Sequence, residues 1–155
     1  HREFASRGVA AARVIFAARR AEADYLALYG HADLLLDTWP YNAHTTAADA
    51  LWMQCPVVTW LGDTFAGRVG ASLVTAAGVP ELAAADVDGY VALAIALARD
   101  ESRRRALRAR LAEARATSPL FDAAAMARHI ERACATMTAQ AREGRRASFA
   151  VPAAD

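Results

Sequence analysis

Short apolar runs alternate with helix-like segments through the first half of the chain. Three runs, Val14–Phe16, Leu34–Leu36 and Val57–Trp60, are short and mainly apolar, which is typical of strands in a buried parallel sheet. The three leucines in a row predict a strand that is covered on both faces. Between these runs, Ala23–Gly30 predicts a helix of one to two turns ending at its glycine, and Thr45–Met53 predicts a second helix with a threonine as its N-cap.

A third helix is predicted after the Val57–Trp60 strand. Thr64 is suited to cap it, and apolar residues from Phe65 to Val74 recur at helical spacing before Gly78 and Pro80 end the pattern. Strands that alternate with helices at this spacing indicate βαβ units with right-handed crossovers. The fold class predicted is therefore α/β, a Rossmann-like parallel sheet with flanking helices.

The second half of the chain changes character after Asp86. Three helices are predicted there, with a break at Ser118-Pro119 between the last two: Val87–Arg99, Glu101–Ala116 and Asp122–Arg142. We expect one lobe over residues 1–143, made of a Rossmann-like part (1–85) and a helical part (86–143), followed by a loose tail over residues 144–155.

Composition excludes several classes of function. The 155 residues carry a net charge of +1, no lysine, and 55% hydrophobic residues, which fits one packed domain. Five arginines between 103 and 110 stand among Ala, Leu and Glu without aromatic neighbours, so a solvated helix face is favoured over nucleic-acid binding. Cys55 and Cys134 lack ligand partners at zinc spacing, so no metal is expected. With no signal peptide and no apolar run of ~18 residues, we expect no membrane contact and a cytoplasmic location.

The loop over residues 37–46 carries the most informative polar residues. It leaves the carboxyl end of the leucine strand, where open parallel sheets bind ligands, and it delivers His44, Thr45 and Thr46 to the start of a helix. Unpaired N–H groups at a helix start attract anions, so these residues suit a diphosphate. Asp49, one turn further on, is placed to reach a ribose hydroxyl. Each of these residues also has a purely structural interpretation. Thr45 or Thr46 could simply cap the helix, His44 could be an ordinary loop histidine, and Asp49 could be favoured by the helix dipole.

Two further features allow two interpretations each. The loop Gly62–Arg68 follows the next strand. It either lines a sugar or acceptor site or is simply a capped helix start. The second interpretation is favoured, because its residues can pair with one another locally. Tyr25 either stacks on a base or is a core aromatic. The chain shows no nucleophile elbow, no phosphate-binding loop with Gly-Lys-Ser and no dinucleotide glycine fingerprint.

Four segments closely resemble the C-terminal catalytic lobe of the protein O-GlcNAc transferase family, especially its bacterial and SPINDLY-like members. They are His31–Trp52, Cys55–Thr59, Gly62–Val69 and Ser118–Asp122. The resemblance implies a GT-B glycosyltransferase, in which two Rossmann-like lobes enclose the active site, and it places this chain in the C-terminal lobe without that lobe's first strand. Such enzymes neutralise the leaving diphosphate without a metal, so no cofactor beyond the donor substrate is implied.

The same resemblance implies roles for individual residues. Residues matching His44, Thr45 and Thr46 contact the diphosphate and sugar of the donor, with His44 a possible catalytic group. The family also implies ribose contact by Asp49, uracil stacking by Tyr25, and recognition of the uracil edge by the backbone near Arg20. The chain departs from the family at Ala21-Glu22, where basic or histidine residues and prolines are common, and in having no lysine.

The implied function is inverting transfer of GlcNAc from UDP-GlcNAc to Ser or Thr of a protein. Its implied partners are UDP, the acceptor protein, the N-terminal GT-B lobe and tetratricopeptide repeats. We expect these 155 residues to be a fragment that is inactive alone. A GDP-fucose donor and a non-catalytic binding module are the alternatives.

Overall fold

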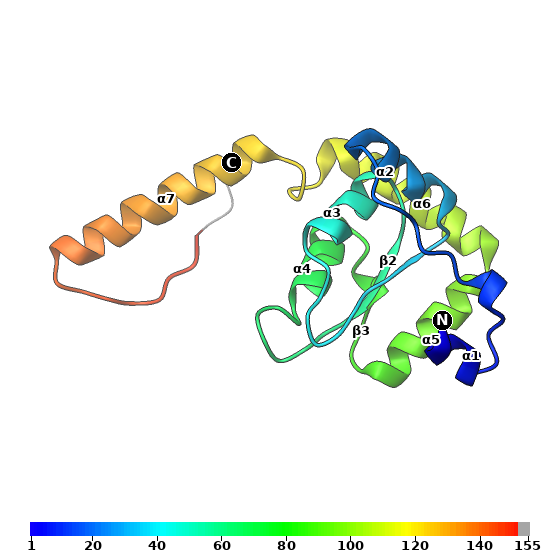
Figure 1. The fold of residues 1–155 in the computed structure, drawn as a ribbon. Helices are drawn as coiled ribbons and strands as arrows, with labels where there is room; N and C mark the ends of the chain where they lie inside the picture. The colour runs from blue at the N-terminus through cyan, green and yellow to red at the C-terminus, as the bar shows by residue number, and fades with distance from the viewer. Residues whose placement is uncertain (152–155) are drawn as a thin grey trace.

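The computed structural model describes residues 1–151 and contains a three-stranded parallel sheet flanked by helices (Figure 1). The strands are β1 (Leu35–Leu36), β2 (Val57–Trp60) and β3 (Ala83–Ala84), in the order β1-β2-β3. Leu35 pairs with Val57 and Thr59 pairs with Ala83, both in parallel register. The predicted α/β architecture with a parallel sheet is confirmed.

Helices connect and surround these strands. The α-helices are α1 (Arg2–Ser6), α2 (Glu22–Leu28), α3 (Thr45–Trp52), α4 (Val69–Ala76), α5 (Val87–Arg99), α6 (Glu101–Thr117) and α7 (Ala123–Arg142). Three 3-10 helices join them: η1 (Ala11–Arg13), η2 (Tyr29–His31) and η3 (Pro80–Leu82).

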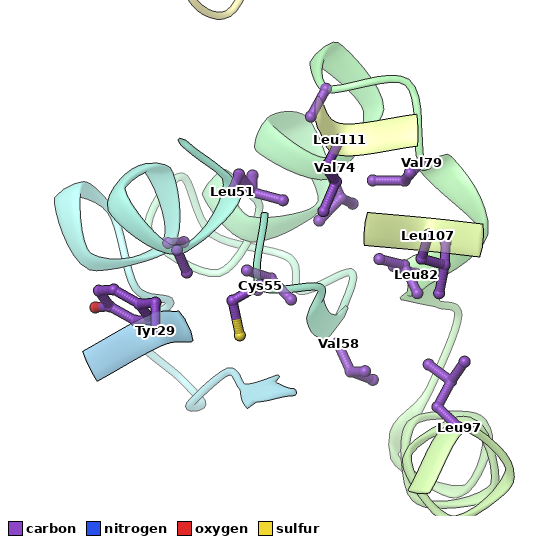
Figure 2. Close-up of a cluster of buried hydrophobic side chains, with 14 residues drawn as sticks. Tyr29, Leu51, Cys55, Val58, Val74, Val79, Leu82, Leu97, Leu107 and Leu111 are labelled. Carbon is purple, nitrogen blue, oxygen red and sulfur yellow. The ribbon is translucent and has the colours of Figure 1, made fainter. Parts of the chain in front are cut away.

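The hydrophobic core lies where α3, α4, α5 and α6 meet the sheet (Figure 2). Helices α3 and α4 pack on each other and on β2, while α5 packs on β2 and β3 and against α6. Leu51, Val74, Leu97 and Leu111, one from each of these helices, are fully buried. Because α6 also contacts α3, the helical second half closes the core that the βαβ units begin.

Aspartate caps explain why the helices of the second half could be predicted closely. The side chains of Asp86, Asp100 and Asp122 accept hydrogen bonds from the backbone N–H three residues on, at 2.8, 2.9 and 2.8 Å. A carboxylate at this position satisfies an otherwise unpaired N–H and interacts favourably with the helix dipole. Helices α5, α6 and α7 begin at the next residue in each case, as the periodicity indicates.

Two strand predictions need correction. Val14–Phe16 is not a strand: Ile15 is 88% exposed and Phe16 is 68% exposed. None of the strands in residues 1–151 pairs with this segment, so its backbone has no neighbouring strand to bond to, and Ile15 and Phe16 stay exposed. The leucine strand exists, but only over two residues. It forms the edge of the sheet, and Leu36 is 54% exposed. The prediction that this strand is covered on both faces is therefore wrong.

Helix starts and one strand also differ from the prediction. His44, not a threonine, is the N-cap of α3, and Thr45 is the first helical residue. Helix α4 begins at Val69, because residues after Gly62 first form a closed turn. Strand β3 was not predicted, since its two alanines form no recognisable apolar run.

The arginines of α6 are not simply a solvated face. Arg104 donates from Nη1 to the carbonyls of Leu97 and Ala98 at the end of α5, at 2.7 and 2.9 Å. Arg108 donates to the carbonyl of Ala32, ahead of β1, and Arg110 binds the Gly78 carbonyl and the Glu81 carboxylate. Arginine reaches these acceptors because its long stem packs along the surface while its planar head offers several donors.

The last long helix stands apart from the rest of the molecule. Figure 1 shows α7 extending away from the body that contains α3 to α6. None of its residues is buried, and Met126, Ile130 and Met137 are each about half exposed along one side. No helix in residues 1–151 is both long and apolar enough to cross a membrane.

The predicted loose tail falls partly outside the described residues, which end at Val151. From Arg145 to Val151 the chain forms no helix or strand. It turns back toward α7, where the Ala147 N–H donates to Oε1 of Gln140 at 3.1 Å. Residues 152–155 of that predicted tail lie beyond the described part.

The two thiols should react very differently. Cys55 is fully buried in the core, and burial raises its pKa to about 11, while Cys134 is exposed on α7. Since the thiolate is the nucleophile, iodoacetamide at pH 8 should modify Cys134 and leave Cys55 unmodified. Mass spectrometry should show one adduct on the native chain and two after denaturation in guanidinium. Rapid modification of Cys55 in the native chain would contradict the packing shown in Figure 2.

Candidate functional site

The start of α3 is the candidate anion site. The His44 side chain makes no capping hydrogen bond, so the N–H groups of the first turn, beginning at Thr45, keep no capping partner from this residue. Thr45 and Thr46 are both exposed. The start of an eight-residue helix therefore presents two hydroxyls and the positive end of the helix dipole at one place. This arrangement is chemically suited to bind a phosphate group.

His44 is enclosed by aromatic rings. Its imidazole stacks on Tyr41 with ring centroids 4.8 Å apart and an interplanar angle of 14°, and the Phe65 ring stands edge-on to it at 6.3 Å. Its Nε2 atom is buried and has no hydrogen-bond partner in the described chain. A buried polar atom without a partner is costly, which makes this nitrogen a place where a ligand atom would add a missing hydrogen bond.

Tyr25 and Asp49 are brought together although 24 residues separate them. The Tyr25 hydroxyl donates to Oδ2 of Asp49 at 3.3 Å and lies 2.6 Å from the Tyr29 hydroxyl. Tyr29 in turn donates to the backbone carbonyl of Thr46 at 3.3 Å. Burial, with the hydrogen bond to Tyr25 second, raises the pKa of Tyr29 well above its ordinary value. The two tyrosines thus tie α2 to the first turns of α3.

Arg20 is not drawn into this cluster by any side-chain contact. It is exposed and lies in the irregular segment just before α2, whose first residue is Glu22. The structure therefore places Tyr25 and Asp49 together, places His44, Thr45 and Thr46 side by side, and leaves Arg20 on the segment that leads into α2. Tyr25 is half-buried, so part of its ring stays accessible.

Asp37 is a site residue that sequence reasoning missed. It directly follows β1, is only 5% exposed, and accepts three hydrogen bonds. The donors are the N–H of Thr38 at 2.8 Å, the N–H of Ala43 at 2.7 Å and the hydroxyl of Thr59 at 2.7 Å. The register of the sheet explains this contact: Leu36 lies beside Val58 in parallel strands, so the next residues, Asp37 and Thr59, are also neighbours. The sequence alone does not give that register.

The tyrosine of α5 closes the same region from the other side. Tyr90 donates its hydroxyl to the backbone carbonyl of Asp37 at 3.0 Å, and its ring lies 4.6 Å from the Trp60 ring. Burial and, to a lesser extent, the negative charge of Asp37 raise the pKa of Tyr90. Trp60 also stacks on Trp39 of the loop, with ring centroids 6.4 Å apart.

The second candidate loop, Gly62–Arg68, forms a closed turn. The N–H of Gly62 donates to the Gly67 carbonyl at 2.8 Å, and the Thr64 hydroxyl accepts from the Gly67 N–H at 3.1 Å. Thr64 therefore caps this turn and not an α-helix. Phe65, 82% exposed, and Arg68 line an open groove of about 840 Å³ along α4, which does not include the start of α3.

Metal-ligand geometry is not found around these loops. Within residues 1–151, no group of three or more His, Cys, Asp or Glu side chains is positioned to hold a metal ion. The backbone dipoles of α3 place partial positive charge at its start.

Comparison with known proteins identifies relatives over most of the chain. Residues 1–130 match the family model described as glycosyl transferase family 41. A curated protein of Hordeum vulgare, named probable UDP-N-acetylglucosamine–peptide N-acetylglucosaminyltransferase SPINDLY, is 40% identical over 114 residues, which are 74% of this chain and 12% of that protein. A UDP-N-acetylglucosamine–peptide N-acetylglucosaminyltransferase of Caenorhabditis elegans is 38% identical over 75% of this chain and 10% of its own length.

A solved structure supports the same relationship. A mutant of the Thermobaculum terrenum O-GlcNAc transferase superposes with a TM-score of 0.73 and 36% sequence identity. The match covers 79% of this chain and 23% of that chain. The present chain thus corresponds to roughly an eighth of the length of its curated plant relatives and to about a quarter of the solved transferase.

Proposed function

The chain belongs to glycosyl transferase family 41, and from this premise we propose that it binds the nucleotide-sugar donor of a protein glycosyltransferase. The donor proposed is UDP-GlcNAc, and the acceptor is a Ser or Thr hydroxyl of a protein. Relatives at 38–40% identity are named as UDP-N-acetylglucosamine–peptide transferases, which supports this donor class. The observation that carries the proposal is the uncapped, exposed start of α3 beside the linked pair Tyr25 and Asp49.

The start of α3 supports a role with the diphosphate. In the proposed transfer, the acceptor oxygen forms a bond to the anomeric carbon and releases its proton to a base or to solvent, while the bond from that carbon to the β-phosphate oxygen breaks. Negative charge therefore grows on the leaving UDP. Preorganised donors aimed at a developing charge are often the largest contribution to catalysis. The first-turn N–H groups and the hydroxyls of Thr45 and Thr46 are such donors, and the imidazole of His44 lies beside them.

The pair from α2 and α3 supports a role with the nucleoside. Asp49 is one turn into α3 and accepts from Tyr25, so a ribose that enters beside the helix start meets a carboxylate already held in place. The half-buried Tyr25 ring offers a face for uracil. The backbone near Arg20, just before α2, completes the proposed base contact. The Ala21-Glu22 departure from the family leaves this part of the site less basic.

Completion of the active site requires more protein than this chain. In our proposal an N-terminal GT-B lobe supplies the acceptor side, with tetratricopeptide repeats as further partners. Three aromatic residues around the start of α3 are 61–82% exposed: Trp39, Tyr41 and Phe65. They form a surface that such a lobe would cover. The chain itself has no lysine to add to the charge at the diphosphate.

UDP binding tests the donor assignment directly. Isothermal titration calorimetry on the 155-residue chain should detect weak UDP binding, with GDP weaker. Replacing both hydroxyls, Thr45→Val with Thr46→Val, should cost roughly 1.5–3 kcal/mol for a single charge-assisted hydrogen bond to the diphosphate and more for two, so UDP affinity should fall at least about tenfold. Thr138→Val, on α7 far from the site, is the matched control and should change nothing. Equal UDP affinity of the double variant would make the assignment wrong, and preference for GDP would favour the GDP-sugar alternative.

The nucleoside contact is tested by two changes at Tyr25. Tyr25→Phe keeps the ring and should alter UDP affinity by less than about threefold, because only a hydroxyl linked to Tyr29 and Asp49 is lost. Tyr25→Ala removes the ring, and stacking worth about 1–3 kcal/mol should be lost, a reduction of roughly 5- to 150-fold. Circular dichroism checks that both variants fold. A folded Tyr25→Ala chain with unchanged UDP affinity would show that Tyr25 is a core aromatic.

Transfer activity tests whether the chain is one half of an active site. With labelled UDP-GlcNAc and a serine-rich acceptor protein, the isolated chain should show no multiple-turnover glycosylation. Positioning of the acceptor hydroxyl contributes up to ~7–11 kcal/mol in enzymes, and a single lobe cannot provide it. A longer version of the protein that includes the second lobe is the positive control. Sustained turnover by these 155 residues alone would contradict the proposal.

A further inference from the structure

We propose that Asp37 is a positioning residue for the candidate donor site, which holds the loop 38–44 so that α3 begins at Thr45 with its first turn open to a ligand. The inference rests on the proposed donor binding at that helix start. Asp37 is not proposed to contact the ligand itself, because the residue is buried and its carboxylate accepts three hydrogen bonds from the protein.

The carboxylate closes the loop at both ends with a single oxygen. Oδ1 accepts from the N–H of Thr38, the first loop residue, and from the N–H of Ala43, the last residue before the N-cap His44. These bonds are 2.8 and 2.7 Å long, which is typical of strong hydrogen bonds to an ionised acceptor. The position of His44, the N-cap of α3, is therefore fixed by the hydrogen bond between Asp37 and the preceding residue, Ala43.

The second oxygen anchors the loop to the sheet. Oδ2 accepts from the hydroxyl of Thr59 in β2 at 2.7 Å, and no other hydrogen bond of the Thr59 side chain is found in residues 1–151. The close packing of α4 leaves no room for adjustment here. A Cβ atom at Gly70 would lie 2.3 Å from Oδ2 of Asp37 and 2.5 Å from Oγ1 of Thr59, so only glycine fits.

Asn42 ties the same loop to α4. This residue is 1% exposed; its Nδ2 donates to the Thr38 carbonyl at 2.9 Å and its Oδ1 accepts from the Gly70 N–H at 3.2 Å. Loop 38–44 is thus tied to β2 through Asp37 and Thr59, and to α4 through Asn42. A loop held in this way is preorganised, and preorganisation raises affinity because less conformational freedom is lost on binding.

Thr59 allows the inference to be tested without touching the site. Thr59→Val keeps the shape of the side chain but leaves Oδ2 of Asp37 buried without its donor, whereas Thr59→Ser restores the hydroxyl. Calorimetry should show that Thr59→Val binds UDP roughly three- to tenfold more weakly and that Thr59→Ser binds as the unchanged chain does. Asp37→Asn, which keeps the shape but loses the charge, should weaken UDP binding in the same direction.

A matched control separates positioning from general loss of stability. Ser118 is another buried hydroxyl; it donates to the Ala76 carbonyl at 2.6 Å, away from the loop. Ser118→Ala should lower the melting temperature comparably to Thr59→Val but leave UDP affinity unchanged. Amide hydrogen exchange without ligand gives an independent measurement, since exchange at Ala43 should accelerate in Thr59→Val and not in Ser118→Ala.

A double-variant comparison identifies the path of the effect. If Asp37 acts through the helix start, Thr59→Val should cause a smaller loss of UDP affinity in the presence of Thr45→Val and Thr46→Val than it causes alone, because two of the groups it positions, the hydroxyls, are gone while the first-turn N–H groups remain. Additive losses, or unchanged UDP affinity of Thr59→Val, would overturn the positioning role while leaving donor binding intact. Absence of UDP binding by the unchanged chain would instead overturn the proposed function, and this inference with it.

Discussion

A buried carboxylate has to be given hydrogen-bond donors, and in this chain the donors of Asp37 determine the course of the loop between β1 and α3, which forms the candidate site. Transfer of an ionised group out of water is so costly that the surrounding backbone must turn toward it. Here the two ends of the loop do so, together with one side chain of the neighbouring strand. The path of the chain from β1 to α3 follows from that requirement, and α4 and α5 pack against the result.

The elements that could be predicted are those whose signals are local. Asp86, Asp100 and Asp122 each precede a long helical pattern and cap it, so α5, α6 and α7 were predicted almost to the residue. The strand β2 was also predicted with its exact bounds, since it combines an apolar run with a preceding proline. In these segments sequence periodicity and tertiary environment agree, and local propensity is then sufficient.

Other elements depend on what lies beside them, which the sequence does not reveal. Val14–Phe16 has the apolar composition of a strand but no strand beside it in residues 1–151 to pair with. Strand β3 pairs with β2, but its two alanines do not have the composition of a strand. The site divides in the same way. The helix start at Thr45 was predicted from a local pattern to within one residue, whereas the role of Asp37 depends on the register between two strands 22 positions apart in the chain. Arg108 was missed for the same reason, because its acceptor at Ala32 is 76 positions away.

The absence of space at Gly70 has a consequence for how such a sequence can change over time. The side chains of Asp37 and Thr59 meet each other and the backbone of Gly70 in one contact, which leaves no volume for a side chain at Gly70. Any side chain at Gly70 meets a steric overlap, and a replacement at Thr59 that lacks a hydroxyl leaves the buried Asp37 carboxylate without one of its donors. Neutral drift at these positions is therefore narrow: Thr59 can exchange with serine, whereas a larger change would need a simultaneous, compensating change at a neighbour. The course of the loop that they hold is therefore constrained more strongly by these inner residues than by anything on its outer face.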